Sequence, residues 1–319
     1  MTESEISDAD GAQPSDEANL TDSEGEALGE TLDKEGNESD GDGDEKALPE
    51  FRTMQEAVIA AVVGLLLFSG AEKGVVALMI VVGVLQAALI AAWIVATRVP
   101  GRFGAAAVGV LAAAGADVAV TVATRSQLGG LLVVFGLAVP ALFAHQLGRG
   151  GARSAVVDSL AKTAVLVVAP PALVALVQLR HEPSGGQVAA AVGAAAALAL
   201  VVARLTDLAL PIALFDVDVP RGFYGVILGG LAGGAVGQLL LSDNVDFVRG
   251  RAAFTGFAVG ILVSLFSIGT GYLQRQGFLS LGNDSEGIWS ERLRPVYAVL
   301  LPVCFVSPLG YLVCLAIRG

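Results

Sequence analysis

Cysteine, histidine and aromatic residues are all scarce in this chain. Two cysteines and two histidines are too few for a Cys/His zinc site. Cys304 and Cys314 lie in one apolar run, and ten helical positions separate their backbones by about 15 Å, which is beyond disulfide reach. Aromatic residues make up 6% of the chain while glycine occurs 40 times. The apolar content is therefore mainly small and aliphatic, which is typical of helices that pack closely in lipid.

Motifs of catalysis and nucleotide binding are also missing. The sequence has no GxSxG elbow, no HExxH pair and no Walker or GxGxxG loop. No basic segment precedes the first apolar run, so we do not expect a cleaved signal peptide. We predict no resident metal or cofactor and no nucleic-acid partner.

Long apolar runs are abundant, and each is close to the length that crosses a hydrocarbon core of about 30 Å. They cover residues 55–70, 74–97, 103–124, 128–147, 155–178, 187–209, 222–241, 252–274 and 295–317. The first two, joined by a tight link at residues 70–73, are expected to form a helical hairpin. The sequence predicts an all-α, polytopic transmembrane bundle of about nine helices, with the lipid bilayer as its main partner.

The first fifty residues differ sharply from the rest. They hold eighteen of the thirty-one acidic residues against two lysines, so their net charge is near −16, whereas residues 51–319 are near +4. A segment rich in Ser, Gly and acids cannot bury enough apolar surface to offset its conformational entropy. We expect a disordered acidic tail over residues 1–50 and a membrane domain over 51–319. The tail is either simply solvated or binds a basic partner.

Lysine and arginine positions predict the orientation in the membrane, because basic loops favour the cytoplasmic side. With the N-terminus inside, that side receives Arg98, Arg102, Arg149, Arg153, Lys162, Arg204, Arg221, Arg275, Arg292 and Arg294. The other side receives only Lys73, Arg125, Arg180, Arg249, Arg251 and Arg318. We predict a bacterial inner-membrane protein with a cytoplasmic N-terminus and an external C-terminus.

Glycine and proline mark two runs for special packing. Glycine recurs every fourth residue at Gly225, Gly229, Gly233 and Gly237, which leaves one helix face without side chains and allows close helix contact. We favour another helix of the same chain as the partner of this face, with a homo-oligomer as the alternative. The pair at 170–171 predicts a kink in the fifth run, because proline removes a backbone donor.

Ionisable residues inside apolar runs are candidates for function because they are costly in lipid. Asp117 lies towards the predicted outer end of the third run, and His145 lies near the inner end of the fourth. About 15–20 Å along the membrane normal should separate them, which is too far for a proton relay. We interpret Asp117 as a structural residue that bonds to a neighbouring helix.

The predicted cytoplasmic boundary gathers many polar residues: His145, Gln146, Asp158, Lys162, Arg204, Asp207, Asp216, Asp218, Arg221, Glu291, Arg292 and Arg294. Their spacing lets Asp158 pair with Lys162, and Arg204 with Asp207, along their own helices. Interfacial snorkelling with local ion pairs is one interpretation. The other is a cytoplasmic binding pocket that includes Asp158, Lys162, Arg204, Arg221 and Arg275.

Residues 219–302 carry a degenerate motif set. The stretch 219–230 (VPRGFYGVILGG) keeps the proline, an aromatic residue and the glycine pair of an SPGKTWEGxxGG segment, with Gly222 and Gly225 in place of its Lys and Glu. Further on, GYLQR (271–275), ND (283–284) and ERLR (291–294) replace SxxKR, KD and DRxD, and PGHGG is absent. This stretch resembles the CDP-diacylglycerol synthase (phosphatidate cytidylyltransferase) family. Those multi-helix membrane enzymes join CTP to phosphatidic acid with divalent metal at the cytoplasmic face.

The resemblance implies a lipid nucleotidyltransferase that uses magnesium, with Asp207, Asp284, Glu291 and Arg292 as catalytic candidates. The substitutions remove the Lys and Asp residues that would hold metal and triphosphate. Our leading hypothesis is therefore a non-catalytic membrane protein with a similar helical bundle, acting in envelope or lipid organisation. A third hypothesis is small-solute transport with Asp117 and Asp158 as polar sites. The Ala/Gly/Val-rich composition also resembles that of actinobacterial multi-pass membrane proteins.

Overall fold

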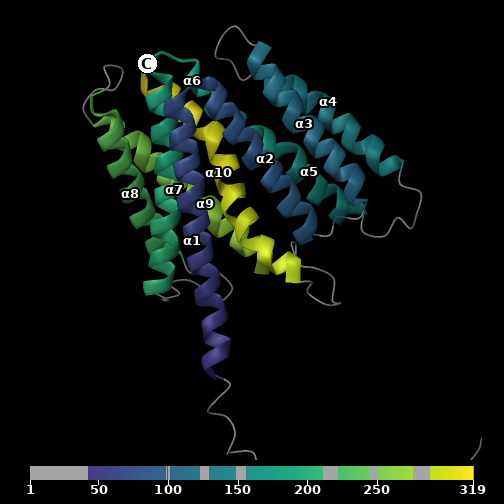
Figure 1. Ribbon diagram of the computed structural model, residues 1–319, viewed down its shortest axis with the longest axis horizontal. Coiled ribbons are helices and arrows are strands. Elements are labelled where there is room, and N and C mark those ends of the chain that lie inside the picture. The colour runs from purple at the N-terminus through teal and green to yellow at the C-terminus, as the bar shows by residue number, and fades with distance from the viewer. Residues whose placement is uncertain are drawn as a thin grey trace, which may run out of the picture. The chain divides into compact units, whose positions relative to one another are not determined.

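The computed structural model describes residues 42–97, 99, 101–122, 129–148, 156–210, 222–243, 250–275 and 288–318. Regular secondary structure within these ranges is entirely helical: α1 (Asp42–Lys73), α2 (Val75–Thr97), α3 (Arg102–Val122), α4 (Gly129–Leu147), α5 (Val156–Ala172), α6 (Val174–Arg180), α7 (Gly185–Ala209), α8 (Phe223–Leu241), α9 (Arg251–Arg275) and α10 (Ile288–Arg318). Figure 1 traces their course. Nine segments of this described part are long and apolar enough to cross a membrane. The all-α transmembrane bundle is thereby confirmed.

The outward surfaces of these helices are strongly apolar. Leu111 in α3 is 71% exposed, and Leu132 and Leu137 in α4 are 72% and 71% exposed. Contiguous apolar surface on this scale is rare on soluble monomers and is typical of surfaces that face lipid. The exposed leucines therefore agree with an integral membrane protein.

Helix α1 is longer than the sequence predicts. It begins at Asp42 and ends at Lys73, so residues 42–50 of the expected tail are helical, while residues 1–41 lie outside the described residues. The link to α2 is not the expected stretch 70–73 but Gly74 alone, whose φ of 125° suits glycine. Gly70 packs against Leu78, with the Cα of Leu78 3.2 Å from where a Cβ would lie. The predicted hairpin is therefore present with a one-residue turn.

The fifth span is broken rather than merely kinked. Its first part, α5, ends at Ala172 after Pro170 and Pro171, and α6 begins at Val174. Proline lacks a backbone N–H and clashes with the preceding turn, so the regular α-helical bonding cannot continue through the pair. The amide of Leu173 instead donates to the Pro170 carbonyl at 3.2 Å. The six residues Val174–Leu179 are all buried, so the break lies inside the bundle.

Helix α8 packs against both α7 and α9, which are the helices it contacts most extensively, and it lies at the left edge of the bundle in Figure 1. A Cβ on Gly233 would collide with the Gly256 carbonyl of α9. A Cβ on Gly229 would lie 2.9 Å from the Ala199 carbonyl of α7. Gly225 faces α7 and Gly237 faces α9 in the same way. The glycine-lined face is therefore filled by helices of the same chain.

Helices α2 and α10 connect this glycine-rich group to α3, α4 and α5. Helix α10 contacts α2, α5, α6, α7 and α9, and α2 also contacts α3, α5 and α6. Contacts near helix ends define two ends of the bundle. We call the end where Glu56 pairs with Arg204 the N-proximal end. The opposite end is where Arg251 donates to the Ile317 carbonyl at 2.7 Å.

Candidate functional site

The break between α5 and α6 carries a polar site at membrane depth. The Gln86 side chain of α2 is 3% exposed, and its Nε2 donates to the Pro170 carbonyl at 3.3 Å. The same nitrogen donates to Asp117 Oδ1 on α3 at 3.2 Å. An amide nitrogen has two N–H donors, so Gln86 can serve both acceptors at once. Three spans are thereby joined through one side chain.

The depth of this site differs from the sequence expectation. Asp117 is five residues from the end of α3, and for this reason the sequence predicts that it lies in the outer part of the membrane. It nevertheless bonds to Gln86, the central residue of α2. Pro170 is likewise well inside its span, Val156–Arg180. The carboxylate therefore lies near the level of the middle of α2, and it bonds to a neighbouring helix as predicted.

His145 lies far from this site. Its imidazole packs on Gly104 near the start of α3, where a Cβ would collide with the ring. Thirteen residues of one continuous helix separate Gly104 from Asp117, which corresponds to about 20 Å. The Nε2 of His145 is buried and makes no hydrogen bond in the described structure. The two residues do not form a relay, in agreement with the sequence analysis.

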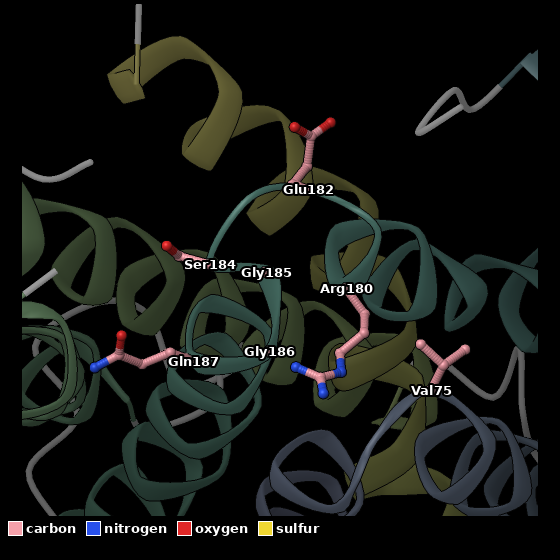
Figure 2. A pocket seen from close by; sticks show the side chains of 7 residues that line it. All are labelled: Val75, Arg180, Glu182, Ser184, Gly185, Gly186 and Gln187. Atoms are coloured by element: carbon pink, nitrogen blue, oxygen red, sulfur yellow. The ribbon is translucent and has the colours of Figure 1, made fainter. Parts of the chain in front are cut away.

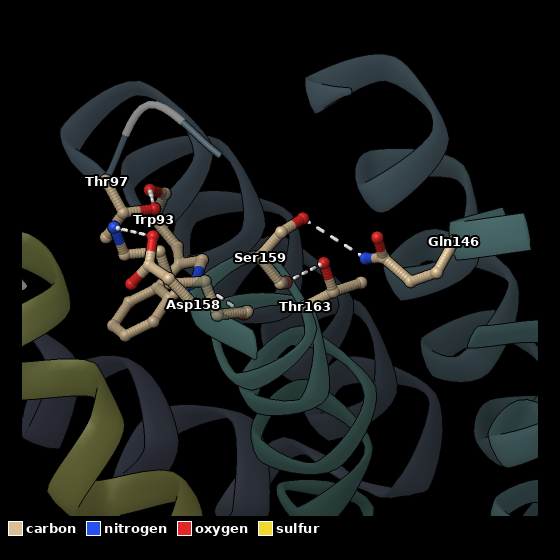
Figure 3. A network of polar contacts seen from close by, with 7 residues as sticks. Trp93, Thr97, Gln146, Asp158, Ser159 and Thr163 are labelled. Carbon is tan, nitrogen blue, oxygen red and sulfur yellow. Dashed lines mark hydrogen bonds and ion pairs between the residues drawn. The ribbon is translucent and has the colours of Figure 1, made fainter. Parts of the chain in front are cut away.

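A second polar cluster occupies the first turns of α5 at the N-proximal end (Figure 3). Lys162 Nζ lies 2.8 Å from Asp158 Oδ2, the pair that the spacing predicts. The lysine side chain is 8% exposed and the aspartate 39%. Gln146 of α4 donates to Ser159 Oγ at 3.1 Å, and Thr163 donates to the Ser159 carbonyl at 2.7 Å. The cluster fastens α4 to the start of α5.

Trp93 connects this cluster to α10. Its indole Nε1 donates to the Lys162 carbonyl at 2.9 Å, and its carbonyl accepts from Thr97 at 2.6 Å. The ring meets Tyr297 of α10 edge to face, with centroids 5.6 Å apart. The indole, buried to 1% exposure, therefore joins α2, α5 and α10.

Two arginines at the N-proximal end contact neighbouring helices, and one of them does not have the partner that the sequence predicts. Arg204 Nε lies 2.8 Å from Glu56 Oε2 on α1, so the predicted partner, Asp207, is wrong. Asp207 instead points towards α8, with Oδ1 3.2 Å from where a Cβ of Gly225 would lie. Arg294 of α10 donates to Gln274 Oε1 of α9 at 3.1 Å. Arg204 and Arg294 thus each link two helices at this end.

The remaining predicted site residues are not assembled by the described structure. Arg292 is exposed near the start of α10, and Glu291 and Arg275 lie in helices whose side chains there are not described. Arg221, Asp216, Asp218 and Asp284 lie outside the described residues. Within the described ranges, no three His, Cys, Asp or Glu residues come together as metal ligands. The cytoplasmic pocket and the nucleotidyltransferase site therefore stay predictions.

A pocket at the opposite end was not anticipated from the sequence. It lies at the turn between α6 and α7 (Figure 2) and is lined by Val75, Arg180, Glu182, Ser184, Gly185, Gly186 and Gln187. Its volume is about 400 Å³. In the sequence Arg180 is one of the few basic residues assigned to the external side, and that was the only available signal.

No protein-family model, curated protein or solved structure matches the chain. The function must therefore be argued from the site itself. The resemblance to the CDP-diacylglycerol synthase family stays a prediction from the sequence.

Proposed function

We propose that the protein is a proton-coupled membrane transporter and that Asp117 carries the proton. The observation that supports the proposal is the single Gln86 nitrogen that bonds both the Asp117 carboxylate and the Pro170 carbonyl. The proposal keeps Asp117 from the transport hypothesis of the sequence analysis, which named Asp117 and Asp158, and pairs it with the helix break in place of Asp158.

The cost of a carboxylate in lipid is the first argument. An ionisable side chain at this depth is expensive, and in membrane proteins it usually marks an ion or proton pathway. A purely structural contact between α2 and α3 could be made by a neutral amide or hydroxyl at lower cost. Asp117 adds what those groups lack, which is the ability to gain and lose a proton.

The broken helix is the second argument. Irregular backbone at membrane depth is tolerated only where it is buried in protein or lines a cavity. Secondary transporters use such breaks near the bilayer midplane to present carbonyl groups to a substrate or coupling ion. Here the Pro170 carbonyl at the break points to the same amide that holds the carboxylate. The Asp117 carboxylate and the Pro170 carbonyl both accept from the Gln86 amide. Protonation of the carboxylate would therefore change the hydrogen bonds at the helix break.

The chemistry of the exchange follows from these groups. Ionised Asp117 accepts the Gln86 N–H, and this hydrogen bond is charge-assisted. When Asp117 takes up a proton it loses its negative charge, so the hydrogen bond that it accepts from Gln86 is no longer charge-assisted and weakens. The contact between α2 and α3 loosens as a result. Proton binding thereby changes the contact between two spans, which is the coupling that alternating access requires.

Proteoliposomes loaded with a pH-sensitive dye test the proposal. The purified protein is challenged with Na⁺, K⁺, amino acids, sugars and nucleosides in turn, and internal pH is followed. We expect at least one solute to drive proton movement in the native protein and not in Asp117→Asn. The exposed carboxylate Asp243 supplies the matched control, because Asp243→Asn removes the same charge outside the spans.

Infrared difference spectroscopy provides an outcome that does not require the solute. A pH step should produce a protonated carboxyl band that Asp117→Asn removes and Asp243→Asn retains. Absence of this band, together with solute responses equal in native protein and Asp117→Asn, would contradict the proposal.

A further inference from the structure

The pocket between α6 and α7 is built around an arginine to which the described residues supply no counter-charge. Arg180 ends α6, and its guanidinium lies across Gly186 in the first turn of α7. A Cβ at Gly186 would collide with Nη1, so the absence of a side chain is what lets the guanidinium lie there. The Nε atom is buried and makes no hydrogen bond in the described structure. A cation placed in this way needs an acceptor.

The neighbouring side chains do not supply that acceptor. Glu182 contributes the carboxylate among the lining residues, and Figure 2 shows this carboxylate directed away from the guanidinium. Gln187 also points away, because its Nε2 donates to the Leu240 carbonyl of α8 at 2.6 Å. No ion pair or hydrogen bond links Arg180 to any described residue. The guanidinium therefore faces the pocket with its donors available.

The start of α7 also favours a bound anion in this pocket. Ser184 precedes α7 in a left-handed conformation with φ of 54°, and its hydroxyl makes no capping hydrogen bond. Figure 2 shows this hydroxyl directed away from the guanidinium, so Ser184 is not a ligand of an anion held by Arg180. The N-terminal turn of α7 contributes the positive end of a helix dipole. An arginine and this field both suit a planar or tetrahedral anion with several acceptor oxygens.

We propose that this pocket binds a phosphate group, either free or in the headgroup of an anionic lipid. The guanidinium of Arg180 contacts two of its oxygens. The volume of about 400 Å³ exceeds that of a bare phosphate and accommodates a phosphate with a small substituent. The site lies where one span ends and the next begins, at Val156–Arg180 and Gly185–Ala209. We expect lipid headgroups at this level, because each span is long enough to cross the hydrocarbon core. The inference is independent of the transport proposal, because it rests on different residues.

Binding of inorganic phosphate to the purified full chain in neutral detergent is the first arm of the test. Thermal stability is measured against phosphate concentration, with chloride at equal ionic strength as the reference, since a ligand that binds the folded state raises the melting temperature. Arg180→Gln should raise the half-saturating phosphate concentration by about tenfold or more, because a charge-assisted hydrogen-bonded pair is lost. Gly186→Ala should raise this concentration by a similar factor, because the added methyl group displaces the guanidinium while its charge is kept.

The matched control is Arg251→Gln, which removes an equal charge at the same end. Arg251 already has a partner, the Ile317 carbonyl, so this variant should bind phosphate like the native protein. Equal weakening in Arg251→Gln and Arg180→Gln would overturn the site and indicate a general charge effect. No stabilisation of the native protein by phosphate or by lipid would overturn it as well.

The second arm identifies the source of the phosphate. The chain is placed in nanodiscs of neutral lipid doped with phosphatidylglycerol, and bound lipid is counted by native mass spectrometry. Retention of phosphatidylglycerol by the native chain and its loss in Arg180→Gln assign a lipid headgroup. Equal retention in both, with phosphate binding still dependent on Arg180, assigns a free phosphate compound.

Discussion

The indole of Trp93 donates to the backbone carbonyl of Lys162 across the α2–α5 interface at 2.9 Å. Phenylalanine at this position would fill much of the same space but would make only an apolar contact. Trp93→Phe keeps an aromatic ring near Tyr297 but removes the donor. We expect the free energy of unfolding to fall by about 0.5–1.5 kcal/mol, the net value of one hydrogen bond. Unfolding by SDS titration from mixed micelles measures the change.

The tyrosine on the other side of the indole supplies the comparison. Tyr297→Phe leaves the edge-to-face ring contact in place, so its effect should be smaller than that of Trp93→Phe. An effect of Tyr297→Phe as large as that of Trp93→Phe would contradict the prediction, because this variant keeps both the ring contact and the indole hydrogen bond.

The lysine of the Asp158–Lys162 ion pair is more deeply buried than the aspartate. Removing one partner or the other should therefore lower the free energy of unfolding by different amounts. Asp158→Asn leaves a lysine that is 8% exposed without its counter-charge. Lys162→Met keeps the aliphatic stem and leaves an aspartate that is 39% exposed free to contact water. We expect a loss of about 1–3 kcal/mol for Asp158→Asn, between the values for buried and exposed pairs, and a smaller loss for Lys162→Met. The same SDS titration compares them, and equal losses would contradict the argument.

The α8–α9 interface should tolerate no added side-chain atom. A Cβ at Gly256 would collide with the Gly233 carbonyl and lie 2.9 Å from the Gly237 nitrogen. Gly256→Ala must therefore separate two backbones, and we expect a loss of roughly 1–3 kcal/mol or more, as in other overpacked cores. Gly269 lies on the same helix with nothing within 4 Å of its Cβ position. Gly269→Ala should be neutral or stabilising by up to about 1 kcal/mol, through helix propensity.

The fold was largely predictable because length and hydropathy decide which segments cross a bilayer. Each of the nine predicted runs overlaps a span of the structure, from the first at residues 51–73 to the last at 292–317. The prolines at 170 and 171 also marked the break, although not its severity. These features depend on residues adjacent in the chain, so a local reading of the sequence finds them.

The candidate site was less predictable because its contacts join distant parts of the chain. Asp117 was visible as a charge in an apolar run, but nothing in the sequence identified Gln86 as its partner. Gln86 is nevertheless the one strongly polar residue in the interior of the α2 span, and that signal could have been used. Arg204 shows the opposite error. A local rule chose Asp207 three residues away, whereas tertiary packing brings Glu56 from α1.

The Glu56–Arg204 ion pair should couple α1 to α7 energetically. A double-mutant cycle with Glu56→Gln and Arg204→Gln should give an interaction energy of about 0.5–3 kcal/mol. The same cycle between Arg204 and Asp207 should give a value near zero, because Asp207 faces α8. Unfolding free energies of the single and double variants provide both cycles. A larger coupling to Asp207 than to Glu56 would restore the pairing predicted from the sequence.

The orientation in the membrane is the last prediction, and it combines sequence with structure. His181 and Phe103 are both exposed and lie at opposite ends of the bundle. The bias of basic residues predicts that the end with Phe103 is cytoplasmic. The two native cysteines are each 0% exposed, so an added surface cysteine can be labelled above a low background. In intact bacterial cells, a membrane-impermeant maleimide should label His181→Cys and not Phe103→Cys. After permeabilisation both should react, and the reverse pattern in intact cells would place the N-terminus outside.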